Sequence, residues 1–255
     1  MPEIEVAERA GVGADGEPRP TEDYVAVLDN AVLLLDGATS PRPDLPSGGW
    51  YAGLLIERLE AGLRTEPDID LAKLLAEAIS AVARDHDLRP GDSPSSTVAI
   101  VRWGEDVVDG LVLADSPIVA FGHRGPDVVA DDRLFSLRDS GKLRTGADVR
   151  DQRNAEGGFW VAEAEPYAAA QAVRRTWSRH TVDALLLASD GVAIGVDEYH
   201  LFDWPEVLAL ARAEGAEAVL DAVRAAEETD PRGERWPRAK RHDDQALAVV
   251  DFTRD

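Results

Sequence analysis

Aspartate residues stand at the ends of two strongly apolar segments of this sequence. Residues 31–35 run directly into Asp36 and Gly37, and residues 184–189 run into Asp190 and Gly191. An aspartate at the end of a buried strand is costly to bury unless it is paired or binds a cation. A single Asp-Gly is more simply a turn with a glycine at positive φ. Because the pattern recurs, the sequence favours one metal site shared by both aspartates.

More carboxylates stand beside other apolar segments, and together they form a set of oxygen ligands. These carboxylates are Glu22 and Asp23, Asp115, and Asp243 with Asp244. Taken alone, Asp115 is a turn residue and Glu22 with Asp23 are exposed loop acids. As a set without Cys or His, they suit Mg²⁺ or Mn²⁺ rather than zinc or copper. Two such ions about 3.5–4 Å apart can hold a bridging hydroxide and support in-line displacement at phosphorus. The expected reaction is hydrolysis of a phosphate ester.

Other catalytic schemes fit the sequence less well. A phosphoaspartyl mechanism of the haloacid dehalogenase type needs a second aspartate two residues after the first, where Ala38 stands. Neither G-x-S-x-G nor G-x-x-x-x-G-K-[ST] is present. The histidines show no metal-ligand spacing; they are His86, His123, His180, His200 and His242.

Composition limits the class of protein. The chain has 255 residues, a formal net charge of −22, 44% hydrophobic residues and no cysteine. We expect a single domain over residues 1–255 with an ample core. The lack of cysteine excludes disulfides and thiolate chemistry. The acidic charge argues against a nucleic-acid partner. No leader or membrane-spanning apolar run is visible, so we expect a cytoplasmic protein without a membrane partner.

Several of the acids are brought together by the elements predicted near the beginning of the chain. Strands are predicted at residues 4–10, 24–28 and 31–35, with a tight turn at Asp29-Asn30 between the last two. Antiparallel pairing would place Glu22 and Asp23 near Asp36 at the far end of that hairpin. Helices follow at residues 50–63 and 71–84, after a Pro/Ser/Gly loop at residues 40–49.

The rest of the chain alternates strands with polar segments. Residues 97–103, 107–114 and 118–122 predict an antiparallel meander, and residues 127–130 one more strand. Further on, the sequence predicts strands at 159–161, 184–189 and 245–251, a helical turn at 166–172, and helices at 204–212 and 216–227. The polar stretch 139–158 is either a solvated loop or a flap that meets an anionic substrate; the sequence favours neither.

Motifs in order along nearly the whole chain, from about Gly16 to Val250, carry a family resemblance. The order TED, LLLDG, SST, LADS, LLLASDG and HDDQALAVV resembles the type 2C (PPM) metal-dependent Ser/Thr protein phosphatases, as in a divergent bacterial member. The resemblance implies an α+β fold: a four-layer αββα sandwich of two antiparallel sheets flanked by helices, with the metal site at one edge. It also implies a phosphoprotein substrate.

The resemblance assigns site residues position by position. It implies that Asp36, Asp190 and Asp243 are catalytic through two Mn²⁺ or Mg²⁺ ions, with Asp36 bridging both and Gly37 adding a carbonyl. Glu22 and Asp23 would hold the second ion or its waters, and Asp115 with Asp190 a possible third ion. Residues 139–158 stand where the family has its flap. Candidates for binding the substrate phosphate are Arg19, Arg9 and Arg153.

The sequence departs from the family pattern directly after Asp36-Gly37. Ala38, Thr39 and Ser40 follow, whereas the family has another residue and then Gly-Gly; here Gly48 and Gly49 come only after an inserted Pro-rich loop. No histidine follows Gly37 as a general acid, and Ala114 and Pro117 replace the usual Gly and Arg. The alternative function is therefore a catalytically weak or inactive module that binds a phosphoprotein.

Overall fold

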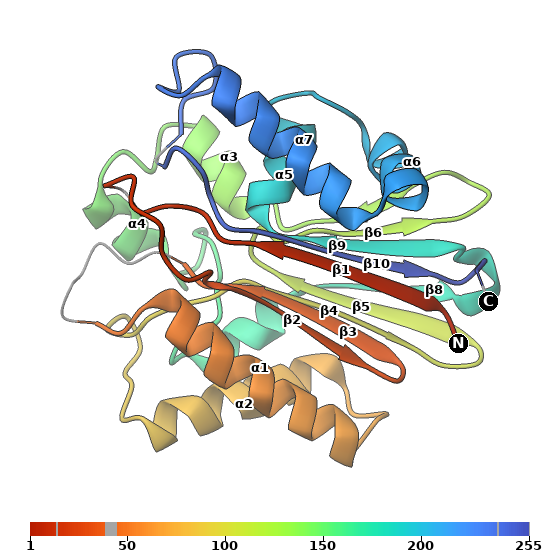
Figure 1. The fold of residues 1–255 in the computed structure, drawn as a ribbon. Helices are drawn as coiled ribbons and strands as arrows, with labels where there is room; N and C mark the ends of the chain where they lie inside the picture. Colours follow the sequence, from red (N-terminus) through yellow and green to blue (C-terminus); the bar gives the residue numbers. More distant parts are fainter. Residues whose placement is uncertain (14, 39–44, 239, 255) are drawn as a thin grey trace.

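Two antiparallel sheets stacked face to face form the centre of the molecule. The computed structural model describes residues 1–13, 15–38, 45–238 and 240–254. Each sheet has five strands, in the orders β1-β10-β9-β6-β7 and β2-β3-β4-β5-β8. Helices α1 and α2 cover one outer face, and α5, α6 and α7 cover the other (Figure 1). The predicted four-layer αββα sandwich of the α+β class is confirmed.

The strands and helices have these bounds. The strands are β1 (Glu3–Arg9), β2 (Asp23–Leu28), β3 (Ala31–Asp36), β4 (Val98–Trp103), β5 (Val107–Leu113), β6 (Ile118–Phe121), β7 (Asp127–Val129), β8 (Val173–Ser178), β9 (Ala184–Ala188) and β10 (Gln245–Asp251). The helices are α1 (Gly48–Thr65), α2 (Leu71–Asp85), α3 (Arg133–Asp139), α4 (Gly146–Gln152), α5 (Asp190–Asp197), α6 (Trp204–Glu214) and α7 (Ala216–Thr229), with short 3₁₀ helices at Pro166–Gln171 and Arg179–Thr181.

Strand β3 is buried on both faces, as its continuous apolar run predicts. Val32 and Leu34 pack into the core between the sheets, where they meet the cluster that contains Leu185 of β9. Leu33 and Leu35 point the other way, into the core beneath α1 and α2. Because side chains alternate along a strand, a strand between two apolar layers needs apolar residues at every position.

The predicted meander of residues 97–122 is wrong in its last step. β4 and β5 pair as expected, but β6 pairs with β7 and β9 in the other sheet. The turn at Asp115 therefore carries the chain from one sheet to the other. Local sequence predicts each strand but not this change of sheet, because strand pairing is decided by packing across the sandwich.

Several elements differ from the local prediction. In the described part of the chain, residues 159–161 form no strand; Phe159 and Trp160 are apolar because they pack into two neighbouring cores. β8 was not predicted, because this edge strand exposes several of its residues. The polar stretch 139–158 contains α4, which begins with a capping box between Thr145 and Asp148. Helix α5 was also missed, since its first residues are the Asp190-Gly191 expected to form a turn.

The strand ends place the acids of interest at one end of the sandwich. β3 leads there into Gly37, β5 into the turn at Asp115, β9 into Asp190, and β10 begins there after Asp244. This end lies on the left in Figure 1, with α4 and the start of α1, away from both chain termini. Among the described helices, none is long and apolar enough to cross a membrane.

Candidate metal centre

The β2–β3 hairpin brings Asp23 and Asp36 together. The two residues are register partners on antiparallel strands, and Glu22 precedes Asp23 on the same strand end. The backbone N–H of Gly37 donates to the carbonyl of Glu22 at 3.0 Å, which extends the pairing beyond the strands. The predicted approach of Glu22 and Asp23 to Asp36 is thus confirmed by the register.

The glycine after Asp36 is required by close packing. A Cβ on Gly37 would lie 2.4 Å from the carbonyl carbon of Gly48. The φ of Gly37 is not in the left-handed region, so the simple turn interpretation does not hold. Gly48 and Gly49 therefore pack against Gly37, although an inserted loop separates them from it in the sequence. Of that predicted loop, residues 39–44 lie outside the described residues.

Glu22 links this glycine contact to the start of α1. Its Oε1 accepts a hydrogen bond from the backbone N–H of Gly49 at 3.2 Å, at the N-terminus of the helix. Its Oε2 lies 3.3 Å from Nη1 of Arg19. A carboxylate is favourable at a helix N-terminus, where unpaired N–H groups carry partial positive charge. Glu22 thus has a structural role in addition to its place beside the acids.

Hydroxyl groups from the SST motif hold the end of β3. Ser96 Oγ donates to the carbonyl of Asp36 at 2.9 Å, and the Asp36 N–H donates to Thr97 Oγ1 at 3.0 Å. Thr97 Oγ1 is also 2.7 Å from Oγ of Ser116, the residue after Asp115. This network fixes the Asp36 backbone relative to the turn that carries Asp115.

The second Asp-Gly is also packed against the backbone. A Cβ on Gly191 would lie 2.0 Å from the carbonyl oxygen of Asp244, and Gly191 too has no positive φ. The N–H of Ser189, beside Asp190, donates to the carbonyl of Ala246 at 3.0 Å. The turn with Asp190 and the residues before β10 are therefore held against each other.

Asp243 and Asp244 have different surroundings. Asp244 is 3% exposed, and its Oδ1 accepts from the N–H of Gly11 at 2.7 Å. Its Oδ2 lies 3.3 Å from Nη2 of Arg19 and 3.3 Å from the N–H of Glu22. Asp243 is partly exposed, and its Oδ1 lies 2.6 Å from Nζ of Lys240. Asp244 thus holds the backbone of Gly11 and Glu22 by hydrogen bonds, whereas Asp243 is more exposed to solvent.

Asp23 is the most deeply buried of these carboxylates. It is 1% exposed, and neither of its oxygens has a hydrogen-bond partner among the described residues. Burial, followed by the negative charges of Asp190 and Asp244, raises the pKa of Asp23 to about 8. A buried carboxylate without a partner is unfavourable when ionised unless a cation compensates its charge.

The other aspartates form one electrostatic group. Burial is the largest cause that raises the pKa of Asp36, and the charges of Asp23, Asp243 and Asp115 raise it further. Burial likewise raises the pKa of Asp190, with Asp36, Asp243 and Asp115 adding to it. The pKa of Asp115 is raised by burial, partly offset by Arg138. Segments far apart in the sequence therefore converge at one site.

The chemistry of this group fits a hard divalent cation. Its donors are carboxylate oxygens, as Mg²⁺ and Mn²⁺ prefer, and neither oxygen of the Asp23 carboxylate has a hydrogen-bond partner among the described residues. No three His, Cys, Asp or Glu side chains of the described residues are already arranged to hold a metal ion.

The candidate phosphate-binding arginines lie in different places. Arg19 contacts Glu22 and Asp244, within the acidic group. Arg9 pairs with Glu217 and Asp221 of α7. Arg153 donates to Ser95 Oγ at 3.2 Å and lies 3.8 Å from Glu163 Oε2. Arg19 is thus the candidate that lies nearest to the acids, whereas Arg9 forms its ion pairs with helix α7.

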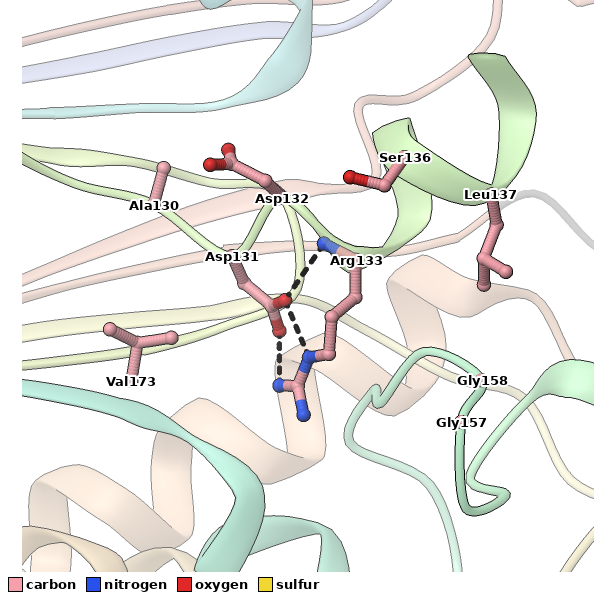
Figure 2. A pocket seen from close by; sticks show the side chains of 9 residues that line it. All are labelled: Ala130, Asp131, Asp132, Arg133, Ser136, Leu137, Gly157, Gly158 and Val173. Atoms are coloured by element: carbon pink, nitrogen blue, oxygen red, sulfur yellow. Dashed lines mark hydrogen bonds and ion pairs between the residues drawn. The ribbon is translucent and has the colours of Figure 1, made fainter. Parts of the chain in front are cut away.

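An open pocket lies beside the Asp115 turn. It has a volume of about 420 Å³, and Figure 2 shows its lining residues. Asp131 holds Arg133 there through Oδ1 and Nε at 2.7 Å, whereas the Asp132 side chain points away from Arg133 (Figure 2). Asp131 Oδ2 also accepts from the N–H of Ala114 at 3.3 Å. The pocket therefore adjoins the acidic group but does not contain it.

Some residues of this region were not predicted. Lys240 contacts Asp243, and Arg138 of α3 is exposed, forms no ion pair among the described residues, and faces the charge of Asp115. Arg224 and Gln245 contact the backbone beside the acids. Of these residues, only Gln245 stands within a motif of the sequence, directly after Asp243-Asp244. The other residues come from segments without a motif.

Solved structures of protein Ser/Thr phosphatases are similar to this chain. The catalytic domain of PstP in complex with two manganese ions has 16% identity and a TM-score of 0.65 over 98% of this chain and 97% of that chain. MsPP from Mycobacterium smegmatis, a PPM Ser-Thr phosphatase in complex with cacodylate, has 16% identity and a TM-score of 0.60, with 98% and 97% covered. Stp1 from Staphylococcus aureus has 16% identity and a TM-score of 0.63, with 99% and 95% covered.

This likeness establishes the class of fold. The chain has the fold of the PPM-type Ser/Thr phosphatases, as the order of its motifs predicted. No protein-family model matches the sequence, and the search of curated proteins finds no match. Because function depends on the site rather than on the fold, the activity has to be argued from the acidic group.

Proposed function

We propose that this protein is a divergent PPM-type phosphatase that uses Mn²⁺ or Mg²⁺ to hydrolyse phosphoserine or phosphothreonine in proteins. One observation carries the proposal: aspartates from separate strand ends lie close enough for their charges to act on Asp36 and Asp190. The charges of Asp243 and Asp115 raise the pKa of Asp36, and they also raise the pKa of Asp190. Such an arrangement is unfavourable in itself and becomes favourable when cations bind.

The ligand roles that we propose are those that the resemblance to the PPM phosphatases implies. Asp36, between Asp23 and Asp190, would bridge two cations, and the Gly37 carbonyl would add a donor. Asp190 and Asp243 would complete the first site, and Asp23 with Glu22 would hold the second ion or its waters. Asp115, which acts electrostatically on Asp190, would share a third ion with it. When bound, the ions supply an activated water and neutralise the phosphate.

The chain's own residues would then position the substrate. Arg19, held between Glu22 and Asp244, would contribute positive charge beside the acids. The end of the flap-like segment 139–158 is tied to Ser95 through Arg153. Ser95 accepts through its carbonyl from the N–H of Ala38, so the segment is connected to the backbone that follows Asp36. A phosphoprotein substrate is supported by the similar solved structures, which are those of Ser/Thr phosphatases.

Hydrolysis of a phosphopeptide and of p-nitrophenyl phosphate tests the proposal. Wild type with Mn²⁺ is expected to turn over both, and EDTA to stop the reaction. Asp36→Asn and Asp190→Asn should each abolish turnover. Asp106→Asn, in the exposed β4–β5 turn at the other end of the sandwich, is the matched control and should retain it. Turnover that persists in both site variants would falsify the assignment.

A second candidate is a module that binds a phosphoprotein without turnover. It is favoured by the absence, among the described residues, of a side-chain group already arranged for a metal ion. The change after Asp36-Gly37 and the missing histidine point the same way. Saturable phosphopeptide binding with no phosphate release in Mn²⁺ or Mg²⁺ would support this candidate, and measurable turnover would exclude it.

A further inference from the structure

A chain of side-chain hydrogen bonds connects the two Asp-containing turns of the candidate metal centre. Gln245 is 1% exposed, and its Nε2 donates to the carbonyl of Gly191 at 3.2 Å. Its Oε1 accepts from Nη2 of Arg224 on α7 at 3.2 Å. The same Nη2 donates to the carbonyl of Asp243 at 3.1 Å. Both contacted carbonyls belong to residues that are, or directly follow, proposed metal ligands.

These bonds join backbone segments that local sequence does not connect. Gly191 belongs to the first turn of α5, directly after Asp190, and Asp243 stands two residues before β10. The close approach of Gly191 to the Asp244 carbonyl leaves little room for the turns to shift separately. Arg224 and Gln245 therefore connect the backbones that carry Asp190 and Asp243.

Arg224 is itself held in place by buried partners. Its side chain is 13% exposed, and its Nε lies 3.8 Å from Oε2 of Glu227, which is 2% exposed. The same Oε2 is 2.8 Å from Nδ1 of His242. The guanidinium is restrained by the two hydrogen bonds from its Nη2 and by the ion pair with Glu227, so it loses little further freedom when its contacts act on a neighbour. This support makes Arg224 a rigid link from α7 to the metal centre.

We propose that Arg224 and Gln245 are positioning residues that hold the Asp190 and Asp243 turns at the spacing a divalent cation needs. The inference rests on the metal site of the proposed function, but it does not depend on phosphatase turnover. Neither side chain would touch the ion. They act by restricting the two ligand-bearing backbones before binding, so that the cation does not have to order them itself.

Calorimetry of Mn²⁺ binding to EDTA-treated, dialysed protein tests this inference. Arg224→Met and Gln245→Leu keep much of the side-chain volume and remove the polar contacts. Each is expected to raise the Kd for Mn²⁺ by about 10- to 100-fold, as partners of metal ligands generally do. The double variant should be little weaker than either single variant, because both changes break the same link.

Arg212→Met is the matched control. Arg212 on α6 pairs with Asp251 at the opposite end of β10, with Nε and Oδ2 2.7 Å apart. Its loss should lower the melting temperature but leave the Kd for Mn²⁺ within about twofold, since distant sites act independently. If Arg224→Met does not fold, Arg224→Lys replaces it; because lysine cannot reproduce the fixed guanidinium contacts, the Kd should still rise.

The inference is overturned if the Arg224 and Gln245 variants bind Mn²⁺ as wild type does, or if Arg212→Met weakens binding equally. It is also overturned if wild type shows no saturable Mn²⁺ binding. Failure of the proposed function looks different: wild type would bind Mn²⁺, the variants would bind it more weakly, and no phosphate ester would be hydrolysed.

Discussion

Asp23 and Asp36 lie directly opposite each other on the antiparallel strands β2 and β3. Like charges at directly opposed positions destabilise a sheet, and this pair also lies beside Asp190. A fold that kept such a pair only for stability would gain by replacing either residue. The pair is therefore best understood as a site that needs a cation, and its cost should be measurable when no cation is present.

The stability of the metal-free protein is expected to fall as the pH rises. Asp23 has a pKa of about 8 in the folded protein and an ordinary value of 3.8. At a pH between these two pKa values, the folded state binds more protons than the unfolded state. The free energy of unfolding therefore decreases as the pH increases. Urea unfolding in EDTA should show a free energy of unfolding that decreases from about pH 4 to about pH 8.

Asp23→Asn serves as the control for this pH dependence. An amide of nearly the same shape does not ionise, so this variant should be more stable than wild type at pH 8 without metal. Its pH dependence should also be shallower. Equal slopes for the variant and wild type would show that Asp23 does not carry the effect.

Mn²⁺ should stabilise wild type and fail to stabilise Asp36→Asn. A ligand at 100 times its Kd stabilises the folded state by about 2.7 kcal/mol, provided it does not bind the unfolded chain. Without metal, Asp36→Asn is expected to melt at a higher temperature than wild type, because it removes one charge from the repelling group. Thermal melts with MnCl₂ and with EDTA measure both effects. An equal Mn²⁺ response in both proteins would argue against Asp36 as a ligand.

Gly191→Ala is expected to damage the site through its backbone. The added Cβ would lie 2.0 Å from the Asp244 carbonyl oxygen, and overpacking of this kind costs about 1–3 kcal/mol. Gly104→Ala is a suitable control, since its Cβ would meet no atom within 4 Å. Urea unfolding should show a lower free energy of unfolding for Gly191→Ala than for wild type. For Gly104→Ala, the free energy of unfolding should stay within about 0.5 kcal/mol of the wild-type value. The reverse order would contradict the packing.

Arg153 and Glu163 are expected to act together on the flap-like segment. Glu163 is 2% exposed and accepts from the N–H of Gly91 at 3.1 Å, so it is a fixed anchor for Arg153. Arg153→Met and Glu163→Gln should both raise KM for a phosphopeptide, by about 10-fold for a loss of 1.4 kcal/mol. KM for p-nitrophenyl phosphate should stay near the wild-type value, because that substrate does not need the segment.

The small substrate distinguishes the two possible roles of Arg153. If Arg153 binds the phosphate directly, Arg153→Met should raise KM for p-nitrophenyl phosphate as well, and Glu163→Gln should have the weaker effect. Arg19→Met is a useful comparison, since Arg19 lies among the acids. It is expected to raise KM for both substrates.

Periodicity and motif order predicted much of the fold because the relevant signals are local. β3 and β9 are continuous apolar runs, and the antiparallel approach of Asp23 to Asp36 follows from a hairpin. The crossing of β6 into the other sheet could not be predicted, because it depends on contacts with β9. Helix α5 was missed for a related reason: Asp190-Gly191 is a turn signal until its packing against Asp244 is known.

The candidate site, like the fold, could be predicted only where the signal is local in the sequence. The acids could be named from their places at strand ends, but the return of Gly48 to Gly37 across an inserted loop could not. Arg224 has no motif, and its contact with Asp243 exists only because α7 packs beside the start of β10. Residues that act by holding other residues therefore become visible only in three dimensions.

Anomalous scattering from crystals grown with MnCl₂ would show whether this acidic group binds divalent cations. We expect anomalous difference density for Mn²⁺ between Asp36, Asp190 and Asp243. The same density should be lost in Asp36→Asn crystals grown under the same conditions. If these aspartates are ordered in crystals grown at saturating MnCl₂ and no anomalous density lies among them, they do not form a metal site.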